Sequence, residues 1–305
     1  GVDAGTTCRI LLSPLLPLEP TWTDHEYTAV MNIRLPRIVL ACLVGCCLSS
    51  AGAAYQGVFQ NPMASPDVLG ASSGASFGAA LAILAGVGNQ GTTLSAFFWS
   101  LATVLVYLVG QRAPGDRVLN LVLAGMVISS LFTAATSYLK LVADPTNQLP
   151  EITYWLMGSL SGTRLADVAR IAPAMAAGLL PLFLLRWKLN LLTLGDDEAR
   201  AMGVNAPRLR FLTVVCATLV TAASIAVSGM IGWVGLVVPH LCRKLVGSNF
   251  RVLLPCSMLA GAAFLLLVDN LSRNLLATEI PIGILTAFTG APFFLYLMLR
   301  KGGAR

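Results

Sequence analysis

The sequence predicts an all-α protein, a polytopic bundle of membrane-spanning helices. Hydrophobic residues make up 56% of the 305 residues and charged residues only 11%, with a mean hydropathy of +0.77, whereas a soluble domain has about 25% charged residues. No Asp, Glu, Lys, Arg or His occurs from Val68 to Gln111. That interval is long enough for two spans of roughly 20 residues each. Both observations argue against an ordinary soluble domain.

Apolar runs along the chain predict nine spans, and Pro- and Gly-containing segments mark most of their ends. Within the runs, Gly, Ala and Ser are frequent, as in "GASSGASFGAA", and such small residues allow helices to pack closely in lipid. We therefore expect one transmembrane domain covering residues 1–305. The predicted spans are approximately residues 38–60, 68–87, 93–111, 118–139, 168–185, 211–229, 231–246, 253–269 and 281–299.

The basic residues predict the orientation of the chain. Segments 112–117, 186–210, 243–251 and 300–305 hold thirteen of the twenty Lys and Arg residues, and the positive-inside rule places such segments in the cytoplasm. The C-terminus is then cytoplasmic, and residues 1–37 form a periplasmic segment whose apolar run is too short to span. We expect a multi-pass protein of the cell inner (plasma) membrane, in contact with lipid and without a nucleic-acid partner.

The polar residues indicate neither an enzyme nor an ion-coupled carrier. The seven cysteines and two histidines show no common metal-ligand spacing, and the sequence offers no nucleophile with a base and no phosphate-binding loop. We therefore expect no cofactor, no metal site and no catalytic residue. Ion-coupled carriers keep ionisable residues within their spans, and here these lie only near the ends. If the protein transports, its energy is expected to come from another subunit.

Segment 191–210, "LLTLGDDEARAMGVNAPRLR", is the most charged stretch of the chain. Asp196 or Asp197 is predicted to cap a short helix, which Gly203 ends. From the residues alone, two interpretations stay open: a solvated loop, or a surface helix on which a soluble motor acts.

The loop "VFQNPMASPDVLG", residues 58–70, lies between two apolar runs and carries no Lys or Arg. Pro62 is predicted to end the preceding helix, Pro66 to keep the chain extended, and Gly70 to let the next helix begin tightly. We interpret the loop as one mouth of a transport pathway; an ordinary helix break is the alternative.

Several long motifs occur in one order, and by them the chain resembles the permease subunits of FecCD-type ABC importers, which carry iron-siderophores, haem and cobalamin. The resemblance extends from "NIRLPR" to the C-terminus. Its motifs are "IRLPR" (33–37), "QNPMASPDVLG" (60–70), "VLAG" (122–125), "YWLMGSL" (154–160), "LGDDEARAMGV" (194–204), "SGMIGWVGLVVPH" (228–240), "RVLLP" (251–255) and "EIPIGILTAFTGAPFF" (279–294).

The resemblance implies ten helices, of which this chain would lack the first, and a homodimer with its pathway along the dimer axis. It also implies two ABC ATPase subunits beneath, so that ATP hydrolysis belongs to a partner, and a periplasmic substrate-binding protein outside. Within the cytoplasmic loop 186–210, the residues that match the ATPase-coupling element are Leu194, Gly195, Asp196, Asp197, Glu198, Arg200, Met202 and Gly203.

The resemblance also assigns both ends of the pathway. Arg34, Arg37 and Arg273 match arginines that pair with glutamates of the binding protein, as planar guanidinium groups can; helix-end arginines reaching toward headgroups are the alternative. The cytoplasmic gate corresponds to Asn61, Pro62, Met63, Val118 and Leu119. At Val118 and Leu119 the cobalamin permease has small hydroxyl residues, so this sequence predicts a more apolar closure.

The sequence therefore predicts the transmembrane subunit of an ABC importer that passes a chelated iron compound, ferric siderophore first, from a binding protein to the cytoplasm. Haem, cobalamin and molybdate stay open as cargo. An ATP-independent carrier or channel is the alternative from another class, although it would need no coupling element.

Overall fold

The protein is helical throughout the part of the chain that the structure describes. The structure is a computed structural model that describes residues 2–14, 16, 19–105, 117–193 and 195–301, and these residues contain no β-strand. The predicted all-α fold is confirmed. In chain order the helices are α1 (Ala4–Leu12), α2 (Asp24–Tyr27), η1 (Thr28–Arg34), α3 (Leu35–Val58), η2 (Pro66–Leu69), α4 (Ala71–Leu84), α5 (Gly88–Ala102), α7 (Arg117–Val142), α8 (Gln148–Met157), α9 (Leu165–Leu192), α10 (Asp196–Ala201), α11 (Ala206–Ser228), α12 (Val234–Val246), α13 (Phe250–Asn274) and α14 (Ile282–Lys301).

Each of the nine predicted spans coincides with a helix, but the helices differ in length. Helix α4 has 14 residues and α12 has 13, fewer than the roughly 20 that a straight span needs. Part of the third predicted span, residues 106–111, lies outside the described residues. Helix length and composition thus support a membrane bundle, but they do not establish that the number of spans is nine. Within the described residues, five stretches are long and apolar enough to cross a membrane: 24–58, 119–142, 165–192, 206–228 and 250–274.

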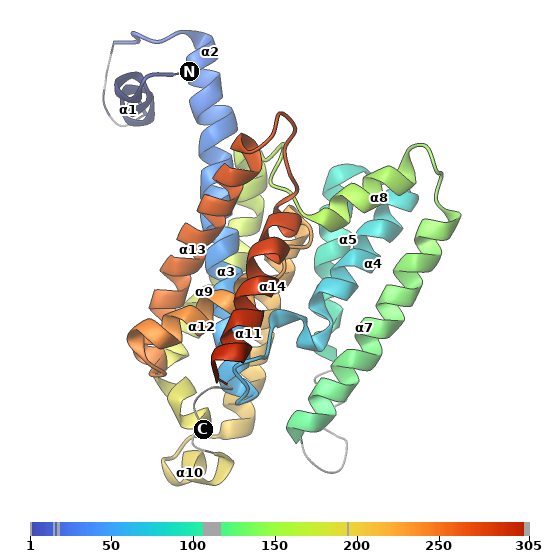
Figure 1. The fold of residues 1–305 in the computed structure, drawn as a ribbon, viewed down its shortest axis with the longest axis vertical. Coiled ribbons are helices and arrows are strands. Elements are labelled where there is room, and N and C mark those ends of the chain that lie inside the picture. The colour runs from blue at the N-terminus through green and yellow to red at the C-terminus, as the bar shows by residue number, and fades with distance from the viewer. Residues whose placement is uncertain (1, 15, 17–18, 106–116, 194, 302–305) are drawn as a thin grey trace.

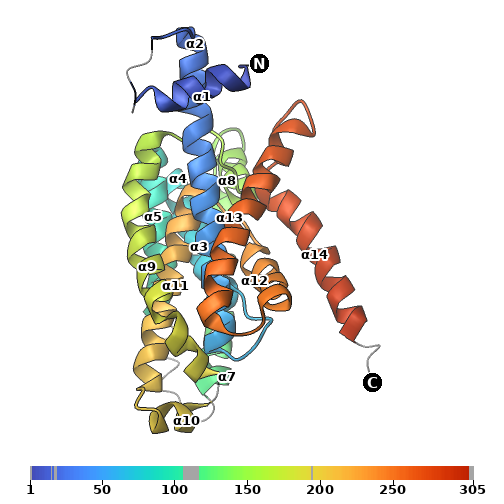
Figure 2. The same cartoon turned by 90° about the vertical axis from the view of Figure 1, so that its left-hand side faces the viewer.

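Helix α3 lies at the centre of the bundle, among α9, α11, α12 and α13 (Figures 1 and 2). Its glycines allow two neighbours to approach backbone to backbone. A Cβ on Gly45 would lie 2.2 Å from the carbonyl oxygen of Gly261 in α13. A Cβ on Gly52 would lie 1.7 Å from the carbonyl oxygen of Gly235 in α12. The small residues noted in the sequence are therefore the contact surfaces of this helix, as expected for packing in lipid.

The helix of the first predicted span begins earlier than that span. It starts at Asp24, runs through the π-helix η1 and continues into α3, whereas the sequence predicted the span from about residue 38. A capping box explains the start: the Thr23 hydroxyl accepts from the Glu26 amide, and the Glu26 carboxylate accepts from the Thr23 amide. No Gly or Pro occurs from Asp24 to Leu35, and the helix continues past Pro36 into α3.

Helix α8 was not predicted, because its ten residues are too short for a span. Its start is organised by Asp144, whose carboxylate accepts from the backbone amide of Asn147 at 2.9 Å; such bonds lower the pKa of Asp144. The helix ends at Gly158, which has a φ of +73°. A Cβ there would lie 2.3 Å from the carbonyl oxygen of Met230, so glycine is needed for both conformation and space.

Helices α7 and α14 are only sparsely covered by the rest of the bundle. Only 17% of the apolar window of α7 is buried, and α14 diverges from the bundle toward its C-terminal end in Figure 2. Large apolar side chains on both helices are exposed within the single chain. They include Leu123, Val127, Leu131, Leu141, Phe288 and Leu295.

Candidate transport pathway and coupling site

The loop after α3 begins with a left-handed turn rather than with a proline. The amide of Gln60 donates to the carbonyl of Gly57 at 3.3 Å, and the amide of Asn61 donates to that of Gln56 at 3.2 Å. These two bonds, with Gln60 at a φ of +48°, form the Schellman arrangement that ends many helices. Helix α3 therefore ends at Val58, and the prediction that Pro62 ends it is wrong.

The Asn-Pro turn that follows is held by its own asparagine. The Asn61 carboxamide accepts from the amide of Met63 at 2.9 Å, and the Asn61 carbonyl accepts from the amide of Ala64 at 3.0 Å. Asn61 and Pro62 are exposed, and the Met63 side chain is 44% exposed while Ala64 is buried. The three predicted gate residues thus project from one tight turn that is anchored at Ala64.

The second half of the loop leads into α4. Ser65 is extended, as predicted, but Pro66 begins the 3₁₀ turn η2, and the Asp67 carboxylate accepts from the Ser72 hydroxyl. Gly70 has a φ of +82°, and a Cβ there would lie 2.9 Å from the Ser129 hydroxyl of α7. The predicted tight helix start at Gly70 is confirmed, and it brings this loop against α7.

Helix α7 carries the other two predicted gate residues in its first turn. Leu119 is 56% exposed, while the side chain of Val118 lies outside what the structure describes. The structure therefore places Leu119 on the surface of the single chain at the start of α7.

The predicted coupling segment forms a short exposed helix, α10, at the end of the molecule opposite α1 (Figure 1). Its N-cap is Gly195, at a φ of +123°, and not Asp196 or Asp197 as predicted; the side chains of these two residues lie outside what the structure describes. The prediction that Gly203 ends the helix is confirmed. Gly203 has a φ of +77°, and its amide donates to the Arg200 backbone carbonyl at 2.9 Å.

One face of α10 is anchored and the other is exposed. Ala199 is fully buried, and the amide of Val204 donates to the Ala199 carbonyl at 3.0 Å. Glu198 and Arg200 are exposed, and the Met202 side chain is 59% exposed. Leu194 lies outside the described residues. The helix thus offers two charges and a thioether for contact with another molecule.

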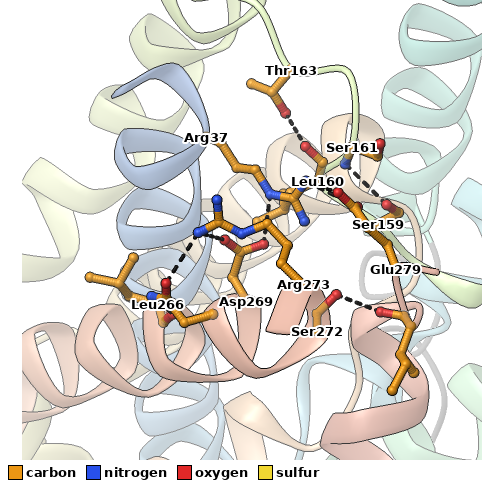
Figure 3. Close-up of polar contacts among 12 residues, drawn as sticks. Arg37, Ser159, Leu160, Ser161, Thr163, Leu266, Asp269, Ser272, Arg273 and Glu279 are labelled. Carbon is orange, nitrogen blue, oxygen red and sulfur yellow. Dashed lines mark hydrogen bonds and ion pairs between the residues drawn. The ribbon is translucent and has the colours of Figure 1, made fainter. Parts of the chain in front are cut away.

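At the opposite end, a buried ion cluster joins α3 to α13 and to the loop before α14 (Figure 3). Arg37 Nε lies 2.9 Å from Asp269 Oδ1, and one Arg37 terminal nitrogen lies 2.9 Å from Glu279 Oε1. Arg273 reaches the other Asp269 oxygen at 3.3 Å. The Asp269 side chain is fully buried, so its charge depends on the two arginines for compensation.

This cluster engages Arg37 and Arg273, two of the three arginines that were expected to dock the binding protein. Arg37 is only 6% exposed and its guanidinium is bound to carboxylates of its own chain. Arg34 is exposed, and the Arg273 side chain is 23% exposed. The sequence interpretation missed the carboxylate partners, although Asp269, an acid within an apolar run, was the available signal.

A cavity of about 440 Å³ lies between α5, α8, α9 and the end of α11. Its lining combines hydroxyl, amide and aromatic groups with one exposed ion pair, in which Arg170 lies 3.5 Å from Asp167. Among the described residues, no group of three or more His, Cys, Asp or Glu could hold a metal ion.

Comparison with known proteins gives consistent results. The sequence model of the FecCD transport family matches residues 6–300. The molybdate import system permease protein MolB of Haemophilus influenzae is 42% identical over 91% of this chain and 83% of its own length. A Helicobacter pylori protein named "Probable iron chelatin transport system permease protein" is 42% identical over 90% of this chain and 83% of its own length. A solved inward-facing structure, described as that of a metal-chelate type ABC transporter, superposes with a TM-score of 0.86 at 38% identity and covers 97% of this chain and 98% of that one.

Proposed function

The chain belongs to the FecCD transport family, and from this premise we propose that it is the membrane subunit of an ABC importer for a chelated iron compound, ferric siderophore first. It is a multi-pass membrane permease, and ATP hydrolysis is assigned to a separate subunit. The observation that carries the proposal is the exposed helix α10, which presents Glu198, Arg200 and Met202 at one end of the molecule. A soluble ATPase needs such a surface to act on.

The assembly proposed is a homodimer with two ATPase subunits on the α10 side and a binding protein on the side of Arg34. Its support is the pair of uncovered apolar faces on α7 and α14, since contiguous exposed apolar surface marks an interaction site or a lipid contact. We assign these faces to the second copy and to the pathway between the copies. The C-terminus and α10 are then cytoplasmic, and residues 1–305 act as one domain.

The transport mechanism proposed is alternating access. ATP binding moves the α10 helices, the bundle halves tilt, and the turn at Asn61, Pro62 and Met63 opens or closes the cytoplasmic end, together with Val118 and Leu119 in the first turn of α7. A ligand shifts such an equilibrium only by binding one state more tightly than the other. Docking of the loaded binding protein near Arg34 supplies that difference outside, and ATP supplies it inside.

A chelated cargo is supported by the character of the exposed α7 face. Between Arg117 and Lys140 this helix carries no charged residue, and its exposed residues are apolar or hydroxyl-bearing, for example Leu123, Ser130 and Leu131. A chelate presents an organic surface with its metal enclosed, and such a surface suits weak apolar and hydroxyl contacts. The relatives named above are permeases for molybdate and for an iron chelatin, so haem, cobalamin and molybdate are the alternative cargoes to test.

The experiment is uptake by a strain lacking this gene, given labelled ferrichrome, haemin, cyanocobalamin and molybdate in parallel. We expect loss of ferrichrome uptake, restored by the intact gene but not by a Glu198→Ala/Arg200→Ala variant of equal abundance. Loss of one of the other cargoes instead would replace the iron-siderophore proposal. Normal uptake of all four would refute it.

The alternative from another class, an ATP-independent carrier or channel, makes an opposite prediction. Proteoliposomes that contain only this chain would then take up the cargo without an ATPase subunit. We expect no uptake under that condition, and uptake only when the ATPase subunit, ATP and the binding protein are all present.

A further inference from the structure

Gln60 occupies a backbone position that normally belongs to glycine. It is the left-handed residue of the Schellman turn at the end of α3, with a φ of +48°, and only Gly adopts this conformation without a steric cost. Among the described residues, Trp233 is the only other non-glycine with a positive φ. A glutamine kept in this position calls for a compensating interaction of its side chain.

The side chain makes that interaction with the end of another helix. Gln60 Nε2 donates to the backbone carbonyl oxygen of Leu192 at 2.6 Å. Leu192 is the last residue of α9, and its side chain is fully buried. Carbonyls in the last turn of a helix have no amide partner within that helix. The Gln60 amide therefore caps α9 from outside.

The position of this bond in the chain is informative. Three residues separate Leu192 from the start of α10, and Gln60 directly precedes the turn formed by Asn61, Pro62 and Met63. The Gln60 side chain thus connects the turn assigned to the gate with the end of α9, the helix that precedes the segment assigned to the ATPase, although Gln60 and Leu192 lie 132 residues apart in sequence.

We propose that Gln60 is a positioning residue that transmits the movement of α10 to the gate turn. This inference rests on the proposed function, because it requires that α10 be driven by an ATPase. When the end of α9 moves with α10, the Leu192 carbonyl draws or releases the Gln60 amide. The left-handed turn that begins the gate then shifts with it, because Gln60 and Asn61 are adjacent.

Substitution by glycine separates this role from a purely structural one. Gln60→Gly removes the link but supplies the residue that the backbone conformation prefers, so the folded protein is expected to be no less heat-stable. Gln60→Asn keeps an amide and tolerates the left-handed conformation, but it is one methylene too short to reach Leu192. Thr193→Ala is the matched control: it removes a 2.7 Å hydroxyl bond to the Asn190 carbonyl at the same helix end without touching the gate turn.

The experiment measures movement at the gate directly. Inside-out vesicles that contain the permease, its ATPase and the Met63→Cys substitution are treated with a membrane-impermeant maleimide, with and without ATP plus vanadate. Labelling of the same complex without Met63→Cys corrects for the native cysteines. ATPase activity and thermal stability are measured in parallel.

We expect ATP plus vanadate to change the labelling rate at position 63 in the parent complex and in Thr193→Ala. In Gln60→Gly and Gln60→Asn this change should shrink about two- to tenfold, the range expected for one lost hydrogen bond, at unchanged ATPase activity. An equal response in parent and Gln60 variants would overturn the role of Gln60 alone. A parent complex whose gate does not respond to ATP would overturn the proposed function as well.

Discussion

Arg37 and Asp269 form a buried ion pair that joins the start of α3 to the end of α13, with Nε and Oδ1 2.9 Å apart. The pair lies where the bundle meets the side assigned to the binding protein. Removing one partner of a buried pair leaves an uncompensated charge, which costs far more than an exposed pair contributes.

We therefore predict that Asp269→Ala lowers the free energy of unfolding by about 3–5 kcal/mol, because Arg37 and Arg273 would both lose their shared carboxylate. The measurement is detergent-solubilised thermal or denaturant unfolding. The control is Arg170→Ala, which removes an exposed pair with Asp167 and should change stability by less than about 1 kcal/mol. Equal effects of the two substitutions would contradict the role assigned to the cluster.

Arg34 and Arg37 are predicted to respond differently to substitution, although they lie three residues apart. Arg34→Gln should weaken binding of the periplasmic binding protein by up to about fivefold, an effect that added salt reduces because the group is exposed. Arg37→Gln should instead reduce stability, since it breaks two ion pairs. Binding-protein titrations at low and high salt, together with melting curves, distinguish the two. A stable Arg37→Gln protein with weakened docking would reverse this assignment.

The sequence was sufficient for the membrane bundle because long apolar runs have few alternative folds, and for the stop of α10 because Gly203 is a strong C-terminal signal. It was insufficient at three places where tertiary contacts decide. The continuous helix from Asp24 depends on a capping box in a mixed sequence, and α8 is too short for a span. The carboxylates around Arg37 come from residues more than two hundred positions away.

In the candidate site, too, some features were predictable from the sequence and others depend on tertiary contacts. The Asn-Pro turn and Gly70 were recognisable because their residue types restrict the backbone. Gln60 was not, because nothing in its type indicates a left-handed conformation. Its role becomes visible only once the end of α9 lies beside it. The positions of helix ends in space, rather than their sequence, determine which side chains link them.

The contact between Gly52 and Gly235 makes a prediction about packing. Gly52→Ala should destabilise the protein by about 1–3 kcal/mol, because the added methyl forces α3 and α12 apart. Gly232→Ala serves as the control, since a Cβ there has no neighbour within 4 Å. Thermal unfolding in detergent measures both. A Gly52→Ala protein as stable as the parent would show that α3 and α12 do not approach as closely as described.

The exposed charges of α10 make the last prediction, which concerns coupling. Glu198→Ala/Arg200→Ala should leave the fold intact, because both side chains are exposed, while uptake falls at least tenfold through loss of contact with the ATPase. Arg208→Ala is the matched control: Arg208 is an exposed charge at the start of α11, close to α10 in the chain but outside it. Uptake and ATPase activity are measured in proteoliposomes alongside co-purification of the ATPase. Undiminished uptake in the double variant would show that the ATPase acts on another surface of the permease. Equal losses in Arg208→Ala would mean that the overall positive charge of this end, rather than α10, holds the ATPase.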